Sequence, residues 1–278
     1  MIVKLWGTRG SLASPGPDTV RYGGNTSCVS VEGSNGTVLV LDAGTGVRVL
    51  GQSISPDIER IHILFTHLHM DHVQGLPFFE PLRLAGVEVH IWGPANASTS
   101  LENRLVRYLS PPLFPVRVHD LLSKLYFHEL SNDRTEIGEF EVKAQMVIHP
   151  NPTLGFRIQE NGATIAYLPD HEPALGAKGF PESAEWTSGY DLSEGVDLLI
   201  HDCQYTTQEY TERIGFGHSS IMDSFRFAAE VNAKELVPFH HDPGHSDDLI
   251  DDMILQTLTE FQPKFTVTPG MEGAVFTI

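Results

Sequence analysis

Short apolar runs rich in β-branched residues recur along the chain, and most end in a polar or glycine-rich turn. Runs of this kind predict buried strands, here over residues 2–6, 28–31, 37–41, 61–65, 87–92, 141–148, 153–158, 163–168, 196–200, 235–239 and 265–268. Apolar positions at helical spacing predict helices over 98–109, 221–232 and 247–261. Prolines limit the regularity of a helical segment over 76–84, and residues 173–194 predict a surface loop. The pattern indicates an α/β protein.

The strand over 61–65 runs directly into a set of metal-ligand side chains, Thr66-His67-Leu68-His69-Met70-Asp71-His72. Residues two apart in an extended segment point to the same side, so His67 and His69 can chelate one cation together. A turn after them carries Asp71 and His72 towards a second cation. Imidazole and carboxylate suit zinc, manganese or iron better than calcium, which prefers oxygen ligands. The alternative, a solvated histidine-rich turn, needs four ligand-type residues to follow a buried strand by chance.

The motif His67-x-His69-x-Asp71-His72 resembles the signature of the metallo-β-lactamase fold superfamily. Residues 73–77, Val-Gln-Gly-Leu-Pro, resemble its ribonuclease Z and cyclic-phosphodiesterase branch. The resemblance implies an α/β (α+β) fold, a four-layer αβ/βα sandwich of two mixed sheets flanked by helices, with residues 1–278 as a single hydrolase domain. It also implies two divalent metal ions, with zinc expected first and manganese or iron as alternatives.

The other ligand candidates also follow strand-like runs: His149 after 141–148, Asp170 after 163–168 and His240 after 235–239. The resemblance implies a first metal on His67, His69 and His149, a second metal on Asp71, His72 and His240, and Asp170 and a hydroxide as bridges between them.

Several alternatives stay open around these ligands. His241 rivals His240, because only one of two neighbours in an extended strand faces a site. His171 and Glu172 are second choices to Asp170, whereas His245 is expected at the surface. In the resembled family the residue matching Asp42 is a buried partner of a ligand histidine or of its backbone.

His218 stands just before the predicted helix over 221–232, with Ser219 as the expected N-cap. A helix start has free N–H groups and partial positive charge, so His218 and Ser219 are expected to contact a phosphoryl group, and His218 to assist the leaving oxygen. Gly217-His218-Ser219-Ser220 resembles the His-Ser-Thr element of the ribonuclease Z branch. That branch has His-Glu where this chain has His201-Asp202, which argues against a ribonuclease and leaves Asp202 as a partner for a nearby histidine.

The N-terminal loop that follows the first strand is rich in Gly and Pro. It either serves only as a connection or holds a phosphate through its donors, which are Arg9, Asn25, Thr26 and Ser27. Asn25 is the substrate-binding candidate among them.

Composition narrows the range of partners. The chain has 278 residues and a formal net charge of −18, which is a poor match for a long nucleic acid, because binding to a polyanion depends on Lys and Arg. Two cysteines, Cys28 and Cys203, form no disulfide framework and fit a reducing cytoplasm. No apolar run suggests a signal peptide or a membrane span. The composition leaves a homodimer open.

These observations predict a dinuclear metal-dependent phosphodiesterase that acts on small cyclic nucleotides or other cyclic phosphodiesters through a metal-bridging hydroxide. Asp71 would orient that hydroxide and His218 would act on the phosphate. The alternatives are a lactonase or thioesterase with the same metals, ribonuclease Z-like RNA processing, and a metal-binding module without turnover.

Overall fold

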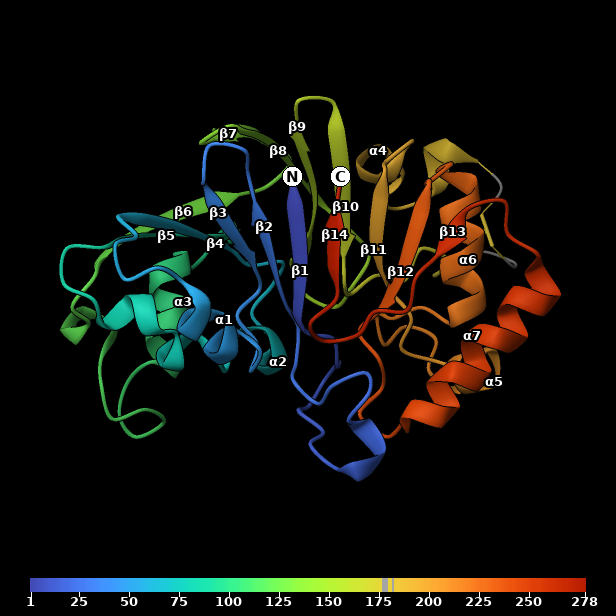
Figure 1. The fold of residues 1–278 in the computed structure, drawn as a ribbon, viewed down its shortest axis with the longest axis horizontal. Helices are drawn as coiled ribbons and strands as arrows, with labels where there is room; N and C mark the ends of the chain where they lie inside the picture. Colours follow the sequence, from blue (N-terminus) through green and yellow to red (C-terminus); the bar gives the residue numbers. More distant parts are fainter. Residues whose placement is uncertain (177–179, 182) are drawn as a thin grey trace.

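Two mixed sheets of seven strands each face one another, with helices on their outer sides (Figure 1). The structure is a computed structural model that describes residues 1–176, 180–181 and 183–278. Residues 177–179 and 182, which belong to the predicted loop over 173–194, lie outside this described part. The predicted α/β sandwich is therefore confirmed.

The first sheet has the strand order β14-β1-β2-β3-β4-β5-β6. The pairs from β14 to β3 are antiparallel and those from β3 to β6 are parallel. Its strands are β1 (Ile2–Gly7), β2 (Cys28–Glu32), β3 (Val38–Leu41), β4 (Arg60–Leu64), β5 (Glu88–Pro94), β6 (Lys124–Leu130) and β14 (Val275–Thr277). The helical segments of this half are η1 (Pro17–Thr19), α1 (Val47–Ser53), α2 (Met70–Val73), η2 (Leu76–Phe78), η3 (Glu80–Arg83), α3 (Leu101–Tyr108) and η4 (Val118–Asp120).

The second sheet has the order β13-β12-β11-β10-β9-β8-β7 and repeats the scheme of the first. The pairs from β7 to β10 are antiparallel and those from β10 to β13 are parallel. Its strands are β7 (Arg134–Ile137), β8 (Phe140–Met146), β9 (Leu154–Glu160), β10 (Ala163–Leu168), β11 (Leu198–Asp202), β12 (Glu235–Phe239) and β13 (Thr266–Val267). Its helical segments are η5 (Ala184–Trp186), α4 (Tyr190–Ser193), α5 (Thr207–Glu212), α6 (Ile221–Glu230) and α7 (Asp247–Phe261).

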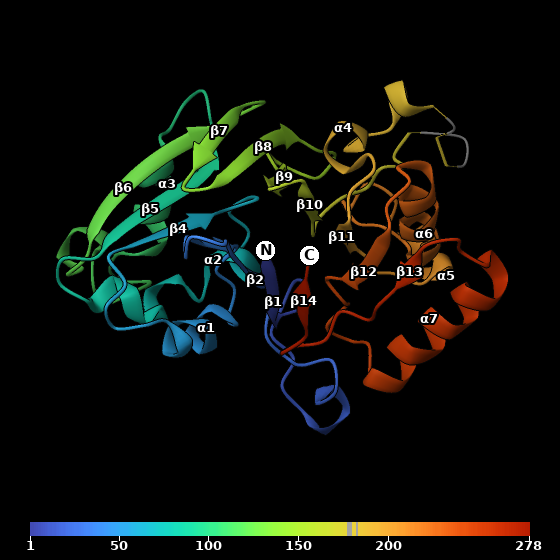
Figure 2. The same cartoon turned by 45° about the horizontal axis from the view of Figure 1, so that its top comes forward.

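Three apolar clusters hold these layers together. The central cluster lies between the sheets and includes Leu5, Leu41, Phe156 and Phe239, all fully buried. A second cluster joins the outer face of the first sheet to α1 and α3, and a third joins the second sheet to α6 and α7. In Figure 2, α6 and α7 lie on the outer side of the second sheet. Burial of both faces explains why the strands appear as apolar runs in the sequence.

The structure differs from the predicted elements in several places. Residues 76–84 form two short 3-10 turns instead of a helix, as Pro77 and Pro81 suggest. Ser220, rather than Ser219, caps α6 by accepting a hydrogen bond from the Asp223 N–H. Strands β6, β7 and β14 were not predicted. All three lie at the edge of a sheet, where exposed residues interrupt the apolar pattern.

Strand direction brings the ligand-bearing segments to one edge. Strands β8 and β10 both run antiparallel to β9, while β11 and β12 run parallel to β10. The carboxyl ends of these four strands therefore open to the same side, and the residues that follow β8, β10 and β12 include His149, Asp170 and His240. Among the helices in the described ranges, none has the length and apolar character that a bilayer span requires.

Candidate metal centre

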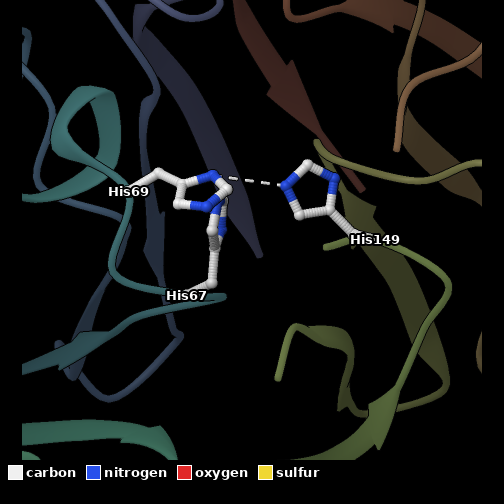
Figure 3. Close-up of side chains that lie close together, drawn as sticks. All are labelled: His67, His69 and His149. Carbon is white, nitrogen blue, oxygen red and sulfur yellow. Dashed lines mark hydrogen bonds between the residues drawn. The ribbon is translucent and has the colours of Figure 1, made fainter. Parts of the chain in front are cut away.

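The seven predicted ligands gather at this edge in two groups. His67, His69 and His149 each offer one ligand atom, and these atoms lie within 4.8 Å of one another. The imidazole rings of this group converge in Figure 3, where a dashed line joins His69 Nδ1 to His149 Nε2, 3.3 Å apart. The second group meets the same distance limit and consists of Asp71, His72, Asp170 and His240.

Asp170 lies between the two groups. Its Oδ1 is 3.8 Å from the Nε2 atoms of both His67 and His149, and 3.4 Å from His240 Nε2. Its Oδ2 is 3.0 Å from His72 Nε2. One carboxylate therefore faces ligand atoms of both groups, which is the arrangement that a bridging ligand requires.

Outer partners determine which nitrogen of each ring faces the cluster. His72 Nδ1 lies 2.8 Å from Asp42 Oδ2, and His149 Nδ1 lies 2.7 Å from the Gly217 carbonyl oxygen. His240 Nδ1 lies 3.0 Å from Gln204 Oε1. Because each of these oxygens accepts a hydrogen bond, each ring carries a proton on Nδ1, and Nε2 is the nitrogen that can bind a cation in the cluster.

The donor set fits a pair of divalent cations. The Nε2 atom of His67 is buried and forms no hydrogen bond with any residue that the structure describes. Burial holds the pKa of His67 well below its usual value, and it lowers the pKa of His149 to about 4. Burial opposes ionisation of Asp170, but His240, His72 and His67 outweigh it and hold the pKa of Asp170 well below its usual range. Neutral imidazoles beside an ionised carboxylate are the protonation states that metal binding needs.

The surroundings of His72 also favour a positive charge. Burial alone would lower its pKa, but Asp170, Asp71 and Asp42 raise the pKa well above its usual value. Three carboxylates around one buried ring favour a cation at this place, and a bound metal would supply the charge instead of a proton.

Asp71 belongs to the second group and is held from the N-terminal loop. Its Oδ2 accepts a hydrogen bond from the Ser11 N–H at 2.8 Å and lies 3.2 Å from the Nε2 atoms of both His72 and His240. The loop approaches closely because residue 10 is glycine: a Cβ there would come within 2.3 Å of the His240 ring. This loop therefore closes one side of the cluster.

His218 lies beside both groups, and it is the nearby histidine with which Asp202 pairs. Its Nδ1 is 2.7 Å from Asp202 Oδ2 and 3.9 Å from Asp170 Oδ1. Burial would lower the pKa of His218, but Asp202 outweighs it and raises the pKa to about 9. Its ring also stacks on His240 with centroids 5.0 Å apart.

The structure separates the rival candidates from the cluster. His241 Nε2 donates to the Gly270 carbonyl oxygen at 3.0 Å, so His240 and not His241 faces Asp71 and Asp170. His245 is buried against Glu209, and the expectation of a surface position was wrong.

Three of the candidate phosphate contacts, Arg9, Asn25 and Ser219, form hydrogen bonds within the protein. Arg9 is fully buried and bonds to backbone carbonyls and to Asp247, which favours the alternative of a structural role over phosphate binding for this residue. The side-chain amide of Asn25 donates to Glu272, and the Ser219 hydroxyl donates to the His171 carbonyl oxygen. Contact of Asn25 or Ser219 with a substrate stays a prediction.

The sequence did not predict the supporting role of three residues near the cluster, Ser11, Gln204 and Glu172. Ser11 acts through its backbone N–H, which any residue type supplies, so the sequence carries no signal for it. Gln204 lies just after β11, where a polar residue following Asp202 could have been noticed. Glu172 was weighed only as a metal ligand, whereas its carboxylate accepts hydrogen bonds from the loop that leads to His218.

Comparison with known proteins places the chain in a family. A family model described as "Beta-lactamase superfamily domain" matches residues 37–241, which contain every ligand candidate. The chain belongs to the beta-lactamase superfamily. The expectation of a metal-dependent hydrolase is therefore confirmed at the level of this superfamily.

The chain is also similar in sequence to a protein named ribonuclease Z. The chain is 26% identical to a ribonuclease Z of Anoxybacillus flavithermus, in an alignment that covers 86% of this chain and 88% of that protein.

Solved structures of the superfamily share the fold along the whole chain. The metallo-beta-lactamase fold protein YhfI from Bacillus subtilis has a TM-score of 0.72 and 19% identity, with 99% of this chain and 98% of that chain covered. The short form of human tRNase Z has a TM-score of 0.68 and 22% identity, with coverage of 100% and 99%. A diphosphatase from the PhnP family has a TM-score of 0.68 and 17% identity, with coverage of 100% and 97%.

Proposed function

We propose that this protein is a dinuclear metal-dependent phosphodiesterase that acts on small cyclic nucleotides or other cyclic phosphodiesters. The observation that carries the proposal is the position of Asp170, whose two oxygens face ligand atoms of two separate groups. A pair of cations with a shared carboxylate is the arrangement that many phosphate-ester hydrolases use.

Each group would hold one cation: His67, His69 and His149 the first, Asp71, His72 and His240 the second, with Asp170 shared. Zinc fits this nitrogen-rich set best, and manganese or iron are alternatives. When bound, two such cations make a water ionise near neutral pH and neutralise the charge that develops on phosphoryl oxygens.

The protein's own side chains would complete the reaction. Asp71, a member of the second group that is held by the Ser11 N–H, would also orient the attacking water. His218 is bound to Asp202 through Nδ1, which leaves Nε2 free to contact a phosphoryl oxygen and to protonate the leaving oxygen. Asn25 and Ser219 are the proposed further contacts with the substrate.

Charge supports a small substrate. The formal net charge of the chain is −18. The two arginines of the N-terminal loop, Arg9 and Arg21, are both paired with carboxylates of α7, so their charge is already matched within the protein. A long RNA would need unmatched cations along its path, whereas a small phosphodiester needs only the metals and a few donors.

RNA processing is the second candidate, and the names of the relatives favour it. The Anoxybacillus flavithermus relative is a ribonuclease Z, and the human neighbour is a tRNase Z. Asp202 occupies the place where that branch is expected to carry glutamate, yet it still pairs with His218 at 2.7 Å. Salt-dependent cleavage of a precursor tRNA would favour this candidate over the small substrate.

The test is an activity screen of the purified, metal-loaded protein. The panel contains bis(p-nitrophenyl) phosphate, cyclic nucleotides, a precursor tRNA, a lactone and a thioester. We expect His67→Ala to abolish phosphodiester hydrolysis and His218→Ala to weaken it, while His119→Ala, an exposed histidine outside the cluster, serves as the matched control. Full activity in His67→Ala would reject this site, turnover of only the lactone or thioester would reject phosphodiester chemistry, and metal binding without turnover would indicate a non-catalytic module.

A further inference from the structure

Glu172 joins the segments that carry two of the ligand candidates. It lies two residues after Asp170, is fully buried, and donates its backbone N–H to the Ile148 carbonyl oxygen at 2.9 Å. Because Ile148 precedes His149, this bond places the chain after β8 next to the chain after β10. Glu172 is therefore built into the frame of the metal centre without facing it.

The carboxylate of Glu172 binds the loop after α5. Its Oε1 accepts hydrogen bonds from the Gly215 N–H at 2.7 Å and from the Tyr210 hydroxyl at 3.0 Å, and its Oε2 accepts one from the Gly217 N–H at 2.7 Å. Among the described residues, no Lys, Arg or His forms an ion pair with it. A buried carboxylate without a cation partner depends on such donors, so these three bonds hold α5 and the loop after it in place.

The same loop acts on the metal centre at two points. The Gly217 carbonyl oxygen lies 2.7 Å from His149 Nδ1, which turns His149 Nε2 towards His69 and Asp170. The next residue in the chain is His218. Gly217 has a φ of 91°, and a Cβ there would come within 2.4 Å of His149 Nδ1, so the backbone itself packs against the ligand ring.

We infer that Glu172 is a positioning residue of the metal centre: its carboxylate fixes the Gly217 peptide units so that His149 presents Nε2 to the first cation and His218 stands beside the cluster. The inference rests on the metal centre of the proposed function. It does not depend on the substrate, because its main consequence is the affinity for metal. Glu172 is not a ligand and does not touch the reacting atoms.

Glu172→Gln tests the inference with little change in volume. The amide keeps one acceptor oxygen but turns an NH₂ group towards backbone N–H donors, so at least one of the three hydrogen bonds is lost. The measurement is titration of the metal-free protein with Co²⁺ against a competing chelator, followed through the absorption spectrum of the bound Co²⁺. We expect the affinity of the first site to fall about 10- to 100-fold, as when other partners that orient a ligand histidine are removed, with an altered Co²⁺ spectrum. The site of Asp71, His72 and His240 should keep its affinity.

Glu139→Gln is the matched control. Glu139, in the turn between β7 and β8, also accepts backbone hydrogen bonds. Its donors are Asn35 and Thr37 in the turn between β2 and β3, at the end of the first sheet that lies away from the metal centre. We expect this variant to bind Co²⁺ as the wild type does. If the loss of hydrogen bonds affected only stability, Glu172→Gln and Glu139→Gln would both unfold at a lower temperature without metal. The spectrum of the bound Co²⁺ would then be unchanged in both variants.

Wild-type Co²⁺ affinity and spectrum in Glu172→Gln would overturn the inference. If Glu172→Gln does not fold, Tyr210→Phe takes its place, because it removes one hydrogen bond and keeps the carboxylate. A weaker first site in Tyr210→Phe supports the inference, and an unchanged one overturns it. These outcomes are distinct from failure of the proposed function, in which the wild type binds two metals but hydrolyses no phosphodiester.

Discussion

Asp42 offers a sharp test of how the metal centre is held, because its carboxylate collects four hydrogen bonds. It accepts from the Thr66 N–H at 2.8 Å, from the Thr66 hydroxyl and from the Tyr167 hydroxyl at 3.0 Å, and it faces His72 Nδ1 at 2.8 Å. Asp42 has a φ of 57°, a conformation that asparagine also tolerates. Asp42→Asn therefore changes the charge and hydrogen bonding without adding backbone strain.

The expected effect follows from Oδ2, which serves both His72 and Tyr167. An NH₂ group at this place leaves two donors without an acceptor, and hydrogen bonds to a charged group contribute about 1.5–3 kcal/mol each, so the free energy of unfolding should fall by about 2–4 kcal/mol after relaxation. His72 can restore its own bond only by moving its proton to Nε2. That tautomer cannot bind a cation, so the affinity of the second site should fall about 10- to 100-fold.

Urea denaturation of the metal-free protein gives the free energy of unfolding, and chelator competition gives the metal affinity. Tyr167→Phe is the control, since it removes one donor from the same carboxylate but leaves the His72 tautomer unchanged. We expect it to lower stability by about 1 kcal/mol and to bind both metals normally. Wild-type affinity at both sites in Asp42→Asn would refute the tautomer argument.

Three further predictions concern single residues. His240→Ala should lose the second cation while His241→Ala keeps both, measured by metal content per chain, and the reverse result would exchange their roles. Gly217→Ala should weaken the first site, because its Cβ would collide with the His149 ring; a wild-type Co²⁺ titration would contradict this. Burial lowers the pKa of His62 to about 4, below its usual value near 6.5, so the unfolded chain binds more protons between these values. Stability from this residue is complete above about pH 6.5 and is lost as the pH falls towards 4. Between pH 7 and 5 the wild type should therefore lose about 2 kcal/mol more than His62→Gln in urea denaturation. Equal losses would contradict this assignment of the His62 pKa.

The strands and the ligand motif could be predicted because their signals are local. The buried run over 61–65 and the ligands His67 to His72 lie together in the sequence. Both faces of each sheet are covered, so the strands appear as continuous apolar runs. Candidates such as His149 and Asp170 were recognisable because each follows a strand. Their convergence depends on strand direction, which the resemblance to a known fold supplied.

The supporting contacts could not be predicted, because they join residues far apart in the chain. Gln204 and His240 are separated by 36 positions, and Arg9 and Asp247 by 238. A single arginine in a glycine-rich loop looks the same whether it is free to bind phosphate or buried against a helix. Ser219 and Ser220 are neighbours of the same residue type, and sequence preferences do not locate a helix end to within one residue. The N-cap of α6 could therefore not be chosen between them.

The dinuclear centre is tested most directly by a crystal structure of the protein loaded with zinc, with anomalous diffraction recorded at the zinc edge. We expect two anomalous peaks per chain, about 3.5–4 Å apart, on either side of the Asp170 carboxylate. One peak would contradict a dinuclear centre, and peaks remote from Asp170 would contradict the site itself.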